Sequence, residues 1–110
     1  MTKKMIAVDL DGTLLNGESK LSDFTKETIK KISKKGHHVV IATGRPYRMA
    51  KDFYDQLELE TPMINLNGSL THLPGRAWKH EKCLTVDKKY LLDIVKRKEE
   101  IEADFIAGEY

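Results

Sequence analysis

The pattern of apolar and polar residues predicts a strand, a helix and a second strand in the first part of the chain. Apolar runs at Met5–Val8 and 38–42 have the length and composition of strands buried on both faces of a sheet. Between them, Ser22 is suited to cap a helix and Gly36 to follow its last turn. The positions at helical spacing in this interval are Leu21, Thr25, Ile29 and Ile32. This order predicts a β-α-β unit whose two strands pair in parallel.

The alternation of strands and helices continues along the rest of the chain and is typical of an α/β fold. Asn67-Gly68 is a strong turn signal that ends a third strand. The further elements expected are a helix over 46–57, a strand over 63–66, a hairpin over 69–80 with its turn at 73–75, a helix from Thr85 or Asp87 to about Glu102, and a strand that begins over 104–107.

Composition narrows the possible classes of function. The chain has 19 basic and 17 acidic side chains, a balance that predicts no nucleic-acid partner. No apolar run is long enough to span a bilayer, so no membrane partner is expected. A single cysteine, Cys83, excludes an internal disulfide and suits a reducing compartment, so a cytoplasmic location is expected.

Two aspartates at the end of the first strand are the strongest chemical signal in the sequence. Asp9 and Asp11 are two positions apart, so in an extended chain their carboxylates point to the same side and can converge on one ligand. Two such anions favour a hard divalent cation between them. Gly12 lets the chain turn sharply, which frees backbone N–H groups to face an anion. Aspartate and glycine are also common turn residues, and paired carboxylates occur in receiver-like acidic pockets.

A second polar cluster follows the second strand. Thr43 offers a hydroxyl, Gly44 an accessible N–H, and Pro46 fits the first turn of a helix. Ligands of open α/β sheets bind at the carboxyl ends of the strands, so this loop is expected to lie beside Asp9 and Asp11. Taken alone, these residues are equally consistent with an ordinary capped helix start.

The first of these stretches resembles the first signature of the haloacid dehalogenase (HAD) superfamily, four apolar residues followed by D-x-D-G-T. The match is complete from Met5 to Thr13. Thr43 resembles the Ser or Thr of the second signature, and the string 42–45, A-T-G-R, is typical of the Cof-type branch with a type IIB cap. The resemblance implies a nucleophile at Asp9 and a general acid and base at Asp11.

The resemblance also implies the remaining site residues. Mg²⁺ is expected at Asp9 and Asp11. The residues expected to bind phosphate are Leu10, Gly12, Thr43 and Gly44, and those expected near the substrate mouth are Arg45, Asn67 and Gly68.

The implied fold is the N-terminal portion of a Rossmann-like HAD core with a parallel sheet over residues 1–84, followed by the start of an α+β cap over 85–110. The implied function is a Mg²⁺-dependent phosphatase that hydrolyses small phosphorylated metabolites, sugar phosphates above all, through an aspartyl-phosphate. The lysine and the late acidic motif of the family have no counterpart in this sequence, so an incomplete site is expected. The first strand is then expected to have an unpaired edge, so that the chain self-associates through it, is marginally stable, or is accompanied by a missing segment. The alternative is a non-catalytic α/β fragment with weak phosphate or metal binding that assembles through this edge.

Overall fold

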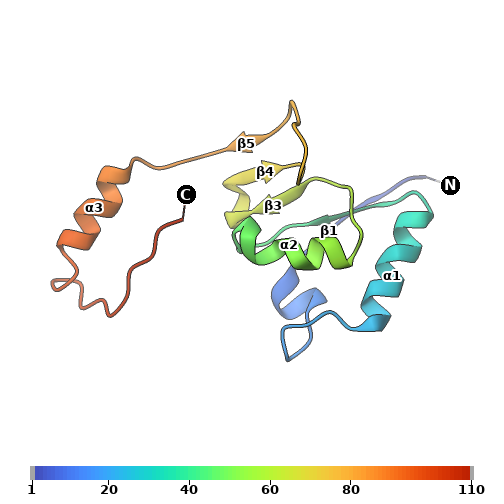
Figure 1. Ribbon diagram of the computed structural model, residues 1–110, viewed down its shortest axis with the longest axis horizontal. Helices are drawn as coiled ribbons and strands as arrows, with labels where there is room; N and C mark the ends of the chain where they lie inside the picture. The colour runs from blue at the N-terminus through green and yellow to red at the C-terminus, as the bar shows by residue number, and fades with distance from the viewer. Residues whose placement is uncertain (1, 110) are drawn as a thin grey trace.

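The expected β-α-β unit forms the first half of the molecule. A computed structural model describes residues 2–109 (Figure 1). Strand β1 (Met5–Val8) lies parallel to β2 (His38–Ile41), with Met5 opposite His38 and Val8 opposite Ile41. Helix α1 (Asp23–Lys34) connects the two strands and begins at Ser22, whose side chain accepts a hydrogen bond from the Thr25 N–H at 3.1 Å. The register places the residues that follow β1 and β2 at the same edge of the sheet.

The chain after β2 adds a second helix and a three-stranded antiparallel sheet. Helix α2 (Tyr47–Gln56) begins one residue after Pro46. Strand β3 (Met63–Asn65) then pairs with β4 (Leu70–His72), and β4 pairs with β5 (Lys82–Cys83). A parallel bridge between Ala42 and Ile64 joins this sheet to the end of β2. The α/β class with parallel strands is therefore confirmed.

The hairpin expected over 69–80 forms, but its second arm lies later in the chain, at β5 (Lys82–Cys83), which pairs antiparallel with β4 (Leu70–His72). The turn at Asn67-Gly68 belongs to a short 3-10 helix, η2 (Leu66–Gly68), which joins β3 to β4. The expected turn at 73–75 lies inside the long connection that leads from β4 to β5. Asn67 makes the tight β3–β4 turn possible because its backbone has a left-handed φ of 54°, which asparagine tolerates well.

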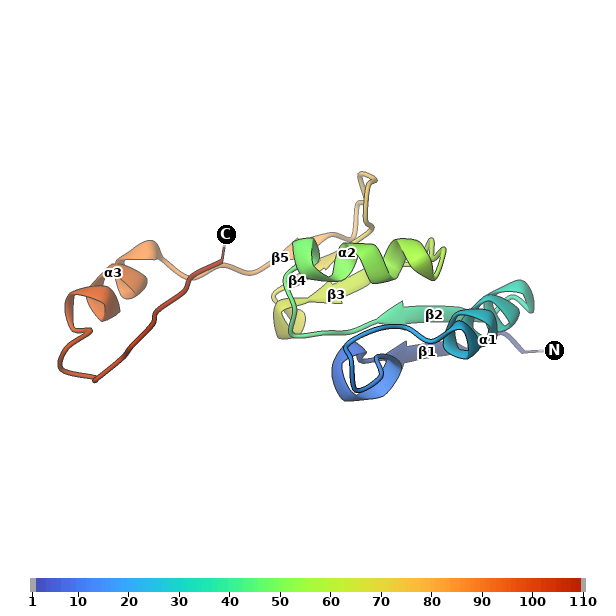
Figure 2. The same ribbon diagram turned by 60° about the horizontal axis from the view of Figure 1, so that its bottom comes forward.

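One apolar cluster holds the strands and the two first helices together. Its fully buried members include Leu10 and Ile41, each 0% exposed, and Met63, also 0% exposed. Ala50 and Tyr54 of α2 belong to the same cluster, as does Ile29 of α1. In Figure 2, α2 lies over β3 and β4 while α1 lies beside β1 and β2. This packing fixes the strand ends at which the candidate site forms.

Strand β1 is more exposed than its apolar sequence predicts. Met5 is 72% exposed and Ile6 37% exposed, where a strand buried on both faces was expected. The reason is that, within residues 2–109, β1 pairs with β2 alone and its other edge has no neighbouring strand. An apolar sequence run thus indicates burial only when covering elements are present.

The C-terminal stretch is the part of the fold that departs furthest from expectation. Helix α3 (Lys88–Lys96) begins at Asp87 as expected but ends well before Glu102, and 104–107 do not form a strand. In both views this stretch stands away from the two sheets (Figures 1 and 2). Its apolar side chains therefore lack a core to pack on, and Leu92 is 58% and Phe105 82% exposed. Over residues 2–109 there is no helix with the length and apolarity that crossing a bilayer requires.

Candidate active site

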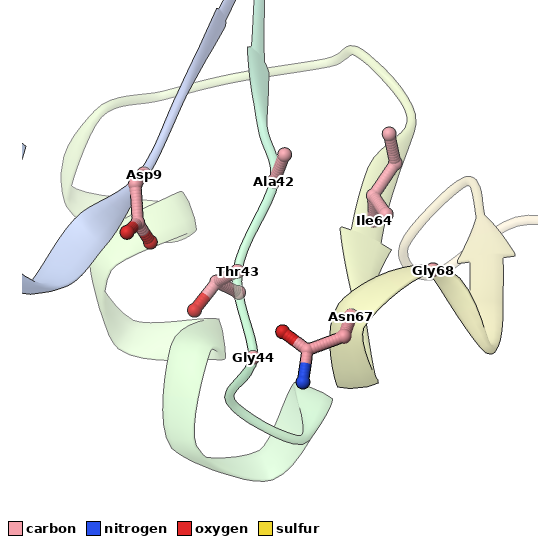
Figure 3. A pocket seen from close by; sticks show the side chains of 7 residues that line it. All are labelled: Asp9, Ala42, Thr43, Gly44, Ile64, Asn67 and Gly68. Atoms are coloured by element: carbon pink, nitrogen blue, oxygen red, sulfur yellow. The ribbon is translucent and has the colours of Figure 1, made fainter.

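The ends of β1, β2 and β3 meet around one open pocket. Asp9 follows β1, Thr43 and Gly44 follow β2, and Asn67 and Gly68 follow β3. All five line the pocket together with Ala42 and Ile64 (Figure 3). The convergence that sequence analysis expects for Asp9 with the 43–44 loop is therefore present in the structure, and Asn67 and Gly68 lie at the same pocket.

Asp9 is an exposed carboxylate at the mouth of a tight turn. Its Oδ1 accepts a hydrogen bond from the N–H of Leu10 at 2.8 Å, while the Leu10 side chain is fully buried. The backbone then turns through η1 (Leu10–Leu14), a π-type turn closed by the Leu15 N–H to the Leu10 carbonyl at 2.9 Å. Gly12 has a φ of 75°, a conformation that favours glycine. The anchored Leu10 and the turn together present Asp9 to the pocket.

Asp11 is directed to a different partner from Asp9. Its carboxylate forms a two-pronged ion pair with Arg45, with Nε to Oδ2 at 2.7 Å and Nη2 to Oδ1 at 2.6 Å. The hydrogen bonds from Arg45 lower the pKa of Asp11, so this carboxyl stays ionised to more acidic pH than a free one. Asp11 does not line the pocket in this structure, although sequence analysis expects both aspartates to converge on one ligand.

Arg45 is occupied by neighbours and does not line the pocket. Besides the pair with Asp11, its Nη1 donates to the Met49 carbonyl at 3.3 Å, and its guanidinium lies 5.4 Å from the centre of the Phe53 ring. These contacts hold the side chain along α2. In this structure Arg45 therefore lies beside Asp11, and its role at the substrate mouth stays a prediction.

Backbone and side-chain hydrogen bonds hold the loop 43–45 in place. The Thr43 N–H donates to the Ile64 carbonyl at 2.9 Å, and its Oγ1 accepts from the Arg45 N–H at 3.0 Å. The Thr43 hydroxyl points toward the side of the pocket that holds Asp9 (Figure 3). A hydroxyl oxygen that accepts a bond keeps its own hydrogen to donate to a ligand.

At Gly44 the backbone passes close to the end of the Asn67 side chain. A Cβ at Gly44 would lie 2.9 Å from Asn67 Oδ1, closer than such atoms pack. The Asn67 N–H also donates to the Thr43 carbonyl at 3.2 Å. The loop after β2 and the turn after β3 therefore form one wall, in which a larger residue at position 44 would displace Asn67.

Two buried polar residues behind this wall were not singled out from the sequence. Asn65 is 0% exposed and donates from Nδ2 to the Arg45 carbonyl at 3.0 Å. Its Oδ1 lies 2.7 Å from Nε2 of His72, whose pKa is lowered by burial, so the imidazole is neutral near pH 7. An asparagine inside the apolar run 63–66 is the signal that could have marked this pair, because buried polar groups need partners.

Comparison with known proteins agrees with the geometry. The sequence profile of the haloacid dehalogenase-like hydrolase family matches residues 6–109. The chain belongs to this family. The resemblance to the HAD superfamily that the two signatures indicate is therefore confirmed. The chain is also similar to two Bacillus subtilis phosphatases. One is YitU, a 5-amino-6-(5-phospho-D-ribitylamino)uracil phosphatase, 44% identical over 82% of this chain and 34% of that protein. The other is the phosphatase YwpJ, 38% identical over 84% of this chain and 32% of that protein.

A solved structure supports the same fold. A haloacid dehalogenase-like hydrolase from B. subtilis superposes with a TM-score of 0.70 and 33% identity, over 89% of this chain and 34% of that one. The chain thus spans about a third of the length of the curated relatives it matches, 34% of YitU and 32% of YwpJ. The fold and the family are established over that third.

Proposed function

We propose that this chain supplies the nucleophile and the phosphate-binding loop of a Mg²⁺-dependent phosphatase that acts on small phosphorylated metabolites, in particular sugar phosphates. The observation that carries the proposal is the single pocket in which Asp9 after β1 faces the 43–44 loop after β2. The phosphatase names of two relatives support the reaction class. The phosphorylated ribityl group in the name of YitU supports a sugar-like substrate.

The proposed reaction begins with attack by a carboxylate oxygen of Asp9 on phosphorus. The bond from phosphorus to the leaving oxygen breaks, and Asp11, once it has left its ion pair with Arg45 and taken up a proton, donates that proton to the leaving oxygen. The resulting aspartyl-phosphate is hydrolysed by a water molecule whose proton returns to Asp11. The hydroxyl of Thr43 and the N–H groups of Gly44 and Gly12 hold the phosphoryl oxygens, where developing charge is greatest. The Leu10 N–H, which donates to Asp9 Oδ1 in this structure, joins them only when it leaves that bond.

The residues present fit a magnesium ion in the chemistry of their donors. Asp9 and Asp11 are exposed carboxylates, and Mg²⁺ takes oxygen ligands and keeps waters in its remaining positions. When bound, the ion would neutralise negative charge on the phosphoryl group. No cluster of three or more His, Cys, Asp or Glu side chains occurs among residues 2–109, so we expect the affinity of this chain for Mg²⁺ to be weak.

The test is phosphate release from small phosphate esters with Mg²⁺, measured for this chain and for a chimera in which the chain replaces the matching segment of YitU. We expect the chimera to turn over and the chain alone to show little activity, because two carboxylates neutralise a phosphoryl group poorly without further cations. An inactive chimera that folds and binds Mg²⁺ would contradict the proposed function.

Asp11 is expected to matter most for poor leaving groups. In the chimera, Asp11→Asn should slow hydrolysis of alkyl phosphates by about 10²-fold or more, the usual scale for a general acid, and that of activated aryl phosphates much less. Arg45→Met is the matched control, because it breaks the same ion pair but leaves the carboxylate in place. Equal losses for both ester classes in Asp11→Asn would argue against proton donation by this residue.

Self-association through β1 is the proposal for the chain in isolation. Carbonyls of Lys4 and Val8 accept hydrogen bonds from the β2 side, at 2.8 Å and 2.9 Å, so the alternate groups at Met5 and Ala7 face the open edge. An apolar strand edge is a template for a second strand. This exposed edge is also the observation that favours the second candidate, a non-catalytic fragment that binds phosphate or metal weakly and assembles through it.

Met5→Pro is therefore expected to weaken self-association by about tenfold or more. Proline has no N–H to donate to a second strand, and the loss of one or two hydrogen bonds at the edge has an effect of this size. The β1–β2 ladder should survive, because the Met5 amide faces away from β2. The measurement is sedimentation over a concentration series, with Met5→Gln as a control that retains the N–H. A stable monomer with a solvent-exposed β1 edge and robust turnover would contradict both the assembly and the expected weak activity.

A further inference from the structure

We propose that Asn65 and His72 are positioning residues that set the place of the loop 43–45. The inference rests on the proposed function in one respect, that this loop holds the phosphoryl group. The chain of contacts runs from His72 on β4, through Asn65 on β3, to the Arg45 carbonyl at the end of the loop. Neither residue lines the pocket, so each acts through the loop.

The bond that Asn65 donates to the loop fixes which atom donates and which accepts in the contact between Asn65 and His72. Nδ2 of Asn65 donates to the Arg45 carbonyl at 3.0 Å, so Oδ1 is the acceptor toward His72, 2.7 Å away. Nε2 of His72 must then carry the hydrogen. The two hydrogen bonds therefore run in one direction, with His72 donating to Asn65 and Asn65 donating to the loop.

Burial makes these contacts specific. Asn65 is 0% and His72 7% exposed, and residues 2–109 contain no buried side-chain nitrogen or oxygen without a partner. A buried amide that loses a partner is costly, so the Asn65 side chain has one favourable orientation. An apolar residue would fill the same space without orienting the loop, which is why a polar pair points to positioning.

His72 also contacts the chain on the far side of the loop. Its ring packs edge-to-face on Tyr47, with 4.9 Å between ring centroids. Tyr47 is the first residue of α2, two positions after Arg45. The loop is thus held at its carbonyl by Asn65 and, just beyond Pro46, by the ring contact with His72. Backbone bonds from Leu66 to the Arg45 carbonyl at 3.3 Å and from Asn67 to the Thr43 carbonyl complete the support.

The test compares His72→Phe with His72→Gln in this chain. Phenylalanine keeps a ring for Tyr47 and removes the donor, whereas the glutamine amide can restore a donor toward Asn65. Amide hydrogen exchange, read by NMR, is expected to become about tenfold faster at Arg45 and Leu66 in His72→Phe, the scale of one lost buried hydrogen bond. In His72→Gln it should stay near the wild-type rate. The reference is the His38 amide, which bonds to Lys4 in the β1–β2 ladder and should be unchanged.

In His72→Phe the buried Oδ1 of Asn65 loses its partner, and this could destabilise the fold. A double variant keeps the test decisive in that case. Asn65→Leu with His72→Phe removes both polar groups and leaves no unpaired partner between them, so it is expected to fold. Fast exchange at Arg45 and Leu66 with a slow His38 amide in this variant supports positioning. Wild-type exchange at the loop in either variant lacking the donor would overturn it. An equal increase in the exchange rates of the Arg45 and His38 amides would also overturn it, because such an increase marks a loss of global stability.

A second measurement separates this inference from the proposed function. Inorganic phosphate with Mg²⁺ is titrated against the Gly44 amide signal, and His72→Phe is expected to weaken the response about tenfold while His72→Gln retains it. If the wild-type chain shows no response to phosphate, the phosphate-binding role fails, and amide exchange alone decides whether Asn65 and His72 position the loop. If phosphate binds equally to all three proteins, the positioning role toward phosphate is overturned.

Discussion

Asp9→Asn in the YitU chimera is expected to reduce phosphate release by about 10⁴-fold or more, the scale at which loss of a nucleophile stops turnover. A carboxamide oxygen does not attack phosphorus, so no aspartyl-phosphate can form. The fold should survive, because Oδ1 of asparagine still accepts the hydrogen bond that the Leu10 N–H donates to Asp9 at 2.8 Å. The large effect thus comes from chemistry and not from the turn.

The measurement is kcat for a small phosphate ester, with trapping of phosphorylated protein in parallel. Asp52→Asn on α2 is the matched control, because it removes an exposed carboxylate that does not line the pocket. We expect Asp52→Asn to keep wild-type turnover and phosphorylation. An Asp9→Asn chimera with near-normal kcat would contradict the assignment of the nucleophile.

The elements that sequence analysis predicted correctly are those specified by neighbouring residues. The Ser22 cap and the glycine at position 36, whose φ is 88°, bound α1 almost to the residue. The apolar run 38–42 became β2 because its members reach the core, with Val39 at 1% and Ile41 at 0% exposure. Local caps and local hydrophobic runs therefore defined the β-α-β unit.

The predictions that were wrong concern features that depend on contacts between distant parts of the chain. The apolar run of β1 forms a strand, yet Met5 remains exposed because no element among residues 2–109 covers it. The expected strand over 104–107 needs a partner strand and forms none. Helix α3 ends at Lys96, well before Glu102, and its apolar face has no core to pack on, with Leu92 58% and Val95 47% exposed. Periodicity indicates which face can be buried, but not what buries it.

In the candidate site, too, some placements follow from local sequence and others depend on contacts between distant residues. The strand-end rule placed Asp9 and Thr43 at one pocket, because parallel register alone brings those positions together. The pairing of Asp11 with Arg45 depends on two side chains that are 34 positions apart and on how α2 begins. No spacing in the sequence indicates it. Such side-chain pairings decide which aspartate faces the ligand.

Thr43→Val is the second large effect expected. The Thr43 hydroxyl points toward Asp9 from a loop whose backbone is already fixed, so it needs no reorganisation to hold a phosphoryl oxygen (Figure 3). Losing one such preorganised donor reduces kcat/KM by something on the order of 10²-fold. Valine has nearly the same shape as threonine, and Thr43 is only 5% exposed, so packing should change little.

One structural cost of Thr43→Val must be separated from the loss of the donor. Valine also removes the acceptor for the Arg45 N–H, which bonds to Oγ1 at 3.0 Å. Thr43→Ser keeps the hydroxyl in both roles and is expected to stay within about tenfold of the wild-type chimera, since it loses only a methyl group from the core. Because the donor acts on charge that develops in the transition state, the loss in Thr43→Val should fall mainly on kcat. A valine variant that raises KM at unchanged kcat would show that Thr43 only binds the ground state, and near-wild-type kcat/KM would remove it from the site.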